Sequence, residues 1–160
     1  MTLLLKQRGF WLSLALSFTV AAIGGALTDL GPWYQNLRQP AWKPPDVWFG
    51  PIWTTIFTLA AVSGWWAWQA AVTPAQRARV VALFGVNAAL NVAWSALFFT
   101  LKRPDWALME WGALWLSVAG LIIGLRGLSA RAAWLLLPYL AWVTVAGVLN
   151  QANVQLNGPF

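Results

Sequence analysis

The side chains that most often carry catalysis are nearly missing from this sequence of 160 residues. Cysteine and histidine are both absent, which excludes thiolate nucleophiles, zinc–thiolate sites, the commonest haem ligand and the usual general base. The acidic residues number four: Asp29, Asp46, Asp105 and Glu110. We therefore expect no metal site, no cofactor and no catalytic residues of the acid–base or nucleophilic kind.

Tryptophan, in contrast, is unusually abundant, with 14 residues beside 8 Phe and 2 Tyr. Indole surfaces bind flat and mostly apolar rings by stacking against them. Trp65, Trp66 and Trp68 lie near the end of an apolar segment and are typical of the interfacial belt of a membrane protein. Trp53 and Trp142 lie too deep in their segments for such a belt. We interpret these two as the better candidates for a ligand pocket.

The segment at positions 80–101 has two distinct faces when it is drawn as a helix. Small residues that allow close approach of helix backbones recur at every fourth position: Gly85, Ala89 and Ala93. Polar residues recur at the same spacing, roughly 200° around the helix: Asn87, Asn91 and Ser95. The small face predicts either packing within one bundle or a homodimer seam. The polar face predicts either interhelical hydrogen bonds or the polar wall of an apolar pocket, and Trp94 favours the pocket.

These residues must be positioned by membrane-spanning elements. The chain is 60% hydrophobic and 9% charged, with mean hydropathy +0.63, whereas soluble domains are about a quarter charged. Its charges leave five apolar stretches that are long enough to cross a bilayer, at about 9–28, 47–72, 74–101, 105–125 and 130–150. We predict an all-α membrane protein: one domain over 1–160, formed by a five-transmembrane-helix bundle. A stiff Trp/Pro-rich loop between the first two helices is placed to cover the mouth of the bundle.

Local signals set the expected helix ends. Thr73–Gln76 has the pattern of a capping box with proline in the first turn, so the third helix should begin near Pro74. Asp105 and Ser129 are the expected N-caps of the fourth and fifth helices. Pro138 lies inside the fifth helix and should bend it.

The positive charges are divided unequally between the two ends of the predicted bundle. The end that includes the N-terminus has six basic residues and no acid: Lys6, Arg8, Arg77, Arg79, Arg126 and Arg131. The opposite end has four basic residues and all four acids. The positive-inside rule then places the N-terminus in the cytoplasm. No basic run exceeds Lys102-Arg103, so nucleic-acid binding is not expected.

Glu110 is one turn past Asp105 and is expected to reach the headgroups near Lys102 and Arg103.

Four motifs in one order resemble the TspO/MBR family, the tryptophan-rich sensory proteins and translocator proteins. The motifs are Trp33-Tyr34-x-x-Leu37-x-x-Pro40-x-Trp42-x-Pro44-Pro45, Pro51-Ile52-Trp53, Asn91-x-x-Trp94 with Phe98-Phe99, and Pro138-Tyr139-Leu140-Ala141-Trp142 followed by Ala146 and Leu149-Asn150. The animal sterol motif has Tyr and Arg after the Leu-Asn pair. Neither follows Leu149-Asn150 here, so sterol recognition by that route is not expected.

The resemblance implies a five-helix bundle, usually a homodimer, with one apolar pocket beneath the first loop. It implies tetrapyrrole ligands such as protoporphyrin IX and haem, and, for the bacterial member that this chain resembles, a place in the bacterial inner membrane. The pocket residues carried over by motif are Trp33, Tyr34, Trp53, Asn91, Trp94, Trp106, Trp142 and Ala146. The dimer seam expected from the small face is Gly85, Ala89 and Ala93.

The leading functional hypothesis is a sensory or regulatory membrane protein that binds protoporphyrin IX or a haem-like ligand. Its expected partners are this ligand, membrane lipid and a second copy of the chain. One alternative is a slow light- or oxygen-dependent porphyrin-degrading enzyme in which Trp53 and Trp142 would take part. A second alternative is a porphyrin or sterol transporter, although five spans give no inverted repeat.

Overall fold

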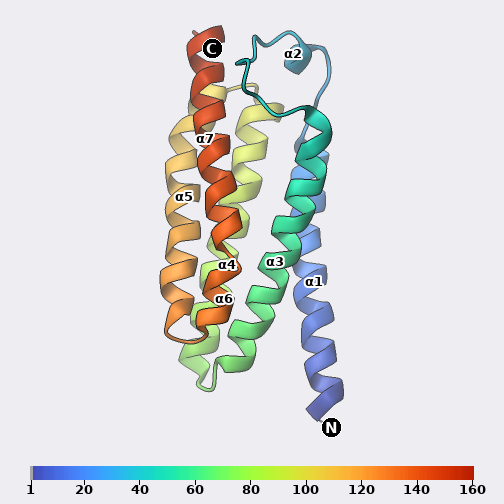
Figure 1. Ribbon diagram of the computed structural model, residues 1–160, viewed down its shortest axis with the longest axis vertical. Coiled ribbons are helices and arrows are strands. Elements are labelled where there is room, and N and C mark those ends of the chain that lie inside the picture. Colours follow the sequence, from blue (N-terminus) through green and yellow to red (C-terminus); the bar gives the residue numbers. More distant parts are fainter. Residues whose placement is uncertain (1) are drawn as a thin grey trace.

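The computed structural model describes the backbone of residues 2–160 and the side chains of residues 7–160, so the side chain of Lys6 lies outside it. Its elements are α1 (Thr2–Leu27), α2 (Pro32–Gln35), η1 (Asp46–Trp48), α3 (Phe49–Ala70), α4 (Pro74–Ser95), η2 (Ala96–Thr100), α5 (Pro104–Arg126), α6 (Ala130–Trp134) and α7 (Leu137–Asn157). Within these described residues, five helical stretches are long and apolar enough to cross a membrane. They lie side by side along the long axis, with the α1–α3 loop above one end (Figure 1). The predicted all-α, five-span fold is confirmed.

Two of the three predicted N-caps are confirmed. Thr73 and Gln76 form a reciprocal capping box, and the hydroxyl of Ser129 accepts a hydrogen bond from the amide of Ala132 at 3.3 Å. The prediction for Asp105 is wrong, because α5 begins two residues earlier than an N-cap at Asp105 implies, with Arg103 as its N-cap. Pro104 occupies the first helical position, where a missing N–H costs nothing. Asp105 instead accepts hydrogen bonds from the guanidinium of Arg103.

The fifth span differs from the expected bent helix. It is broken into α6 and α7 at Leu135 and Leu136, and Pro138 lies in the first turn of α7. Proline fits there because a first-turn residue needs no N–H partner. The helix also continues to Asn157, well past the expected end near residue 150.

The core of the bundle lies along the inner face of α5. Leu114, Val118, Leu121 and Leu125 recur at helical spacing and are almost completely buried. The span formed by α1 is the least buried. It is held against α3 by the hydroxyls of two serines, Ser13 and Ser17, which donate to main-chain carbonyls at 2.7 Å.

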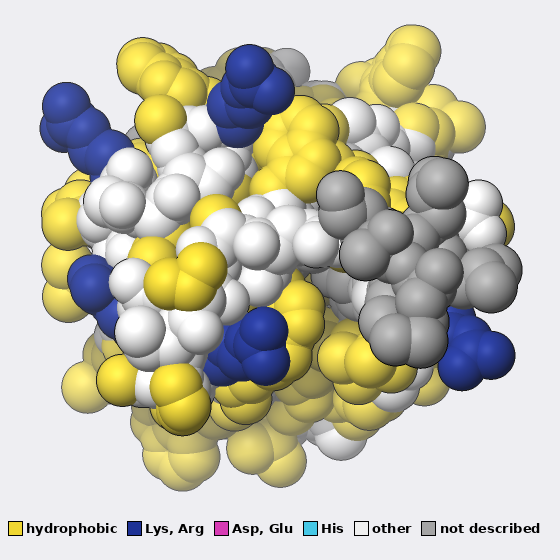
Figure 2. Space-filling view, turned by 90° about the horizontal axis from the view of Figure 1, so that it is seen from below, with side chains coloured by type: hydrophobic (Ala, Val, Ile, Leu, Met, Phe, Trp, Pro, Cys, Tyr) yellow, Lys and Arg dark blue, Asp and Glu magenta, His cyan; other side chains and the backbone are white. Residues whose placement is uncertain are grey.

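Charges at the two ends follow the pattern of the sequence. Figure 2 shows the end at which the N-terminus lies, with several basic side chains near its rim and no acidic side chain in view. The described basic residues at this end are all arginines. The expectation for Glu110 is wrong. Both of its carboxylate oxygens are buried and have no hydrogen-bond partner among the described residues, so they do not reach out toward Lys102 and Arg103. Glu110 lies on the inward face of α5, between Ala107 and Leu114, which explains this burial.

The predicted tryptophan belt at the end of α3 is only partly exposed. Trp68 is 41% exposed, whereas Trp66 packs against the buried core. At the ends of other helices, Trp11 and Trp134 are more than 60% exposed.

Candidate ligand-binding site

A cavity of about 630 Å³ lies among α1, α3, α4, α5 and α7, toward the end of the bundle that the α1–α3 loop covers. This volume is within the usual range for small-molecule sites. Six of the eight pocket residues predicted from the sequence line it: Tyr34, Trp53, Asn91, Trp94, Trp142 and Ala146.

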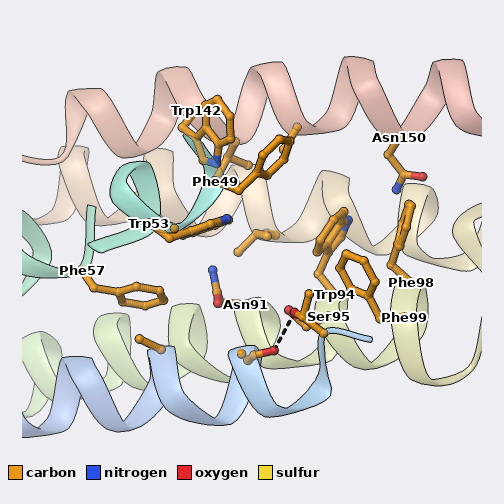
Figure 3. A pocket seen from close by; sticks show the side chains of 18 of the residues that line it. Phe49, Trp53, Phe57, Asn91, Trp94, Ser95, Phe98, Phe99, Trp142 and Asn150 are labelled. Carbon is orange, nitrogen blue, oxygen red and sulfur yellow. Dashed lines mark hydrogen bonds between the residues drawn. The ribbon is translucent and has the colours of Figure 1, made fainter. Parts of the chain in front are cut away.

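One wall of the cavity is formed by rings from α3 and α7. Phe49, Trp53 and Phe57 recur at every fourth position of α3, so all three face the cavity. Trp53 stacks on Phe57 with ring centroids 5.6 Å apart. Trp142 of α7 meets Phe49 edge to face at 5.4 Å. Figure 3 shows the Trp53 and Trp142 rings on the same side of the cavity, opposite Trp94.

The opposite wall depends on the π-helical turn η2. The amide of Leu101 donates to the carbonyl of Ala96 at 2.8 Å, five residues back. A π-helical turn holds more residues than an α-helical one, so residues five apart come near the same face. Trp94 therefore contacts both Phe98 and Phe99, with centroids 5.2 and 6.1 Å away. Such turns often lie at functional sites.

A buried hydrogen-bond network forms the polar part of the cavity wall. The side-chain amide of Asn91 donates to the Tyr139 hydroxyl at 3.0 Å, and this hydroxyl donates to the side-chain oxygen of Asn87 at 3.2 Å. The side-chain amide nitrogen of Asn87 in turn donates to the hydroxyl of Ser117 at 2.9 Å. The asparagine face of α4 therefore makes interhelical hydrogen bonds, and at Asn91 it also lines the cavity.

Two polar atoms of the cavity lining have no partner in the described structure. They are the indole nitrogen of Trp142 and the side-chain oxygen of Asn153, and both are buried. Asn153 is only 3% exposed. Burial without a hydrogen bond costs about 1–3 kcal/mol for each group. Because one atom is a donor and the other an acceptor, a ligand with both functions would satisfy them.

The loop over the cavity is held by Asp46, which is part of the lining. Asp46 accepts a hydrogen bond from the Tyr34 hydroxyl at 3.0 Å and forms an ion pair with Lys43. The Lys43 ammonium also lies 5.6 Å from the centre of the Tyr34 ring. Burial, and then the hydrogen bond to Asp46, raises the pKa of the Tyr34 phenol above its usual value, so Tyr34 remains a neutral donor.

A second attachment joins the loop to the last turn of α7. The side chain of Asn157 accepts from the amide of Arg38 at 2.7 Å and donates to the carbonyl of Arg38 at 3.0 Å. One amide side chain thus satisfies both main-chain groups of a residue 119 positions away.

Replacing Asn157 by alanine should loosen this loop. Loss of two hydrogen bonds of about 1 kcal/mol each predicts that the Arg38 amide exchanges with solvent at least about fivefold faster. Hydrogen exchange followed by mass spectrometry of the 36–42 peptide measures this, with the exposed Gln155→Ala as a control on the same helix. Equal protection in both variants would contradict the attachment.

Two predicted pocket residues lie outside the cavity. Trp33 packs edge to face behind Phe98, with centroids 6.1 Å apart. Trp106 is 47% exposed, and the guanidinium of Arg103 lies 4.0 Å from the centre of its ring. At the start of α5 it is the next residue, Ala107, that faces the inside of the bundle, and Ala107 is fully buried.

Reasoning from the sequence also missed residues of the site. Trp111 lines the cavity and donates from its indole nitrogen to the carbonyl of Val143 at 2.7 Å. Its ring fills the space beside Gly147, where any Cβ would overlap it. The four-residue spacing of Phe49, Trp53 and Phe57 could have identified the aromatic wall, whereas nothing local pointed to Trp111.

The small face of α4 is turned away from the other helices over much of its length. Gly85 and Ala89 are exposed, Ala93 is half-buried, and a Cβ at Gly85 would meet nothing within 4 Å. On α5, in contrast, Gly124 is used inside the bundle, where a Cβ would meet Leu83 at 2.6 Å.

These features define a helical membrane protein with an aromatic cavity beneath a loop. The TspO/MBR family model matches residues 13–155, and the chain belongs to this family. It is 33% identical to the tryptophan-rich protein TspO of Chlorobaculum tepidum, over 91% of this chain and 96% of that protein. It is 34% identical to the tryptophan-rich sensory protein of Cereibacter sphaeroides, over 91% and 92%. The translocator protein of Sus scrofa is 34% identical, over 88% and 87%.

Proposed function

We propose that the protein binds a tetrapyrrole, protoporphyrin IX or a haem-like ligand, in the aromatic cavity and acts as a membrane sensor or regulator of it. The observation that supports this most strongly is the pair of facing aromatic walls around a volume of about 630 Å³. A flat conjugated ring gains burial and about 0.5–1.5 kcal/mol from each well-placed aromatic partner.

The polar atoms of the cavity support a ligand with polar edges. The Trp142 indole N–H would donate to a carboxylate or carbonyl, and the Asn153 oxygen would accept from an N–H or O–H. The chain has no histidine or cysteine, so the macrocycle would be held by stacking and hydrogen bonds rather than through a metal.

Titration of the purified protein with protoporphyrin IX, haem and a sterol tests this function. Saturable quenching of tryptophan fluorescence is expected for the two tetrapyrroles and not for the sterol. The titration is repeated under illumination and in the dark, with the porphyrin spectrum followed over time. Stable absorbance supports a binding role, whereas loss of porphyrin with product formation would support the degrading enzyme. Absence of saturable binding would refute the proposal.

The proposed setting is a bacterial inner membrane with the N-terminus in the cytoplasm. The end at which the N-terminus lies has basic residues and no acid (Figure 2), and all four acids belong to the opposite half of the bundle. The exposed part of the small face of α4 supports a homodimer in which Gly85, Ala89 and Ala93 form the seam.

Ala89→Leu tests the seam. A branched side chain placed where two backbones meet should sharply lower the yield of cross-linked dimer, while protoporphyrin binding is largely retained because residue 89 does not line the cavity. Met109→Leu, at a residue of α5 that is 80% exposed, serves as a lipid-facing control. Unchanged dimer yield in Ala89→Leu would place the seam elsewhere.

A further inference from the structure

A second hollow of about 500 Å³ lies between α1, α3 and α4, nearer the N-terminal end of the bundle than the aromatic cavity. Phe57 and Tyr139 separate the two, since Phe57 lines both and Tyr139 bonds to Asn91 of the cavity wall. We name this hollow the α1–α4 groove. Its lining is mostly aliphatic or aromatic and includes Leu12, Leu16, Ala60, Trp68, Val81 and Ala88.

The hydroxyl and amide side chains that line the α1–α4 groove are hydrogen-bonded within the chain. The hydroxyls of Ser13, Ser17 and Thr19 donate to main-chain carbonyls at 2.7–2.8 Å. Asn87 and the Tyr139 hydroxyl belong to the buried network described above. These groups therefore need no hydrogen bond from an occupant, in contrast to the unpartnered Trp142 and Asn153 atoms of the cavity. A surface of this kind at membrane depth suits a hydrocarbon chain.

Two arginines lie next to the N-terminal end of the groove, although neither is among the residues that line it. Arg8 lies one helical turn before Leu12, and Arg77 one turn before Val81, so both arginines extend the faces that line the groove. The Arg77 guanidinium lies 5.2 Å from the centre of the ring of Trp68, which lines the groove. The Nε of Arg77 donates to the carbonyl of Ala71 at 3.3 Å, and its two terminal nitrogens are the groups that could reach a phosphate. All four acids of the chain belong to the opposite half of the bundle.

We propose that the α1–α4 groove binds an anionic phospholipid. One acyl chain would lie between α1 and α4, and the phosphate would lie between Arg8 and Arg77. Long basic side chains at a membrane interface favour a headgroup of net negative charge over a zwitterionic one. The site is separate from the proposed tetrapyrrole site and can be tested without any porphyrin.

Native mass spectrometry of the protein in equal amounts of phosphatidylglycerol and phosphatidylcholine, with identical acyl chains, tests the headgroup. The wild-type protein is expected to retain phosphatidylglycerol preferentially. The double variant Arg8→Gln/Arg77→Gln should lower this preference by at least about fivefold. The matched control Arg126→Gln/Arg131→Gln removes the same charge from the same end, away from the groove, and should leave the preference intact. Equal effects of the two pairs, or no preference in the wild type, would overturn the proposal.

Ala88→Leu tests the acyl-chain part of the groove. The larger side chain fills the lining and is expected to lower retention of both lipids, with circular dichroism showing that the fold is kept. The dimer fraction is measured in the same spectra because Gly85, at the proposed dimer seam, also lines the groove. A fall in dimer with unchanged lipid retention would mean that a second copy covers the groove, and the lipid proposal would be wrong.

Discussion

Replacement of Trp142 by alanine is expected to weaken protoporphyrin IX binding by roughly 5- to 150-fold, or about 1–3 kcal/mol. Trp142 lies on the cavity wall, its ring meets Phe49, and its indole nitrogen has no partner in the described structure. The substitution removes both the aromatic surface and the donor. Quenching of tryptophan fluorescence by protoporphyrin measures the affinity.

The control for this variant is Trp134→Ala, because Trp134 is 69% exposed and lies outside the cavity. It should leave the affinity nearly unchanged. Trp142→Phe helps to separate the two contributions, since it removes the N–H but keeps a smaller aromatic ring. We expect it to retain more affinity than Trp142→Ala. Equal losses in the Trp134 and Trp142 variants would show that these tryptophans act through bundle stability rather than ligand contact.

Gly147→Ala should destabilise the protein and weaken ligand binding at the same time. A Cβ at this position would overlap the Trp111 indole, which lines the cavity and bonds to the carbonyl of Val143. Overpacking of this kind costs about 1–3 kcal/mol. Thermal unfolding followed by near-ultraviolet circular dichroism, together with the protoporphyrin titration, measures both effects.

Gly112→Ala is the matched control, because a Cβ at Gly112 would meet nothing within 4 Å. Alanine has the higher helix propensity, so this control should keep or raise the unfolding temperature. Of the two glycine variants, only Gly147→Ala is therefore expected to lower the unfolding temperature. A Gly147→Ala protein as stable as the control, with normal affinity, would contradict the packing described for Trp111.

The five spans could be predicted because each depends on a property of a continuous segment: its length, its apolar composition and its flanking charges. The capping box at Thr73 and the cap at Ser129 are equally local, and both are confirmed. Pro138 interrupts the regular fifth span, as predicted, but the kind of interruption differs from the prediction. A helix that restarts beside a proline and a helix that bends at one have the same local sequence.

The site was less predictable because it depends on which face of each helix meets another helix. Trp106 and Ala107 are neighbours in α5, and only the packed structure shows that Ala107 takes the inward position. Asn153 and Asn157 were missed because the fifth span was expected to end near residue 150. Glu110 was placed wrongly for the same kind of reason, since its inward position outweighs its closeness to the helix end.

The π-helical turn η2 has a consequence for comparing this chain with its relatives. Such a turn is the structural equivalent of one inserted residue. An alignment without a gap at Ala96–Thr100, against a relative whose helix is regular there, would pair residues that point about 100° apart. Phe98 and Phe99 would then be matched to side chains of a different helix face. Deleting one residue within η2 should likewise restore regular α-helical bonding and turn one of the two phenylalanines away from Trp94.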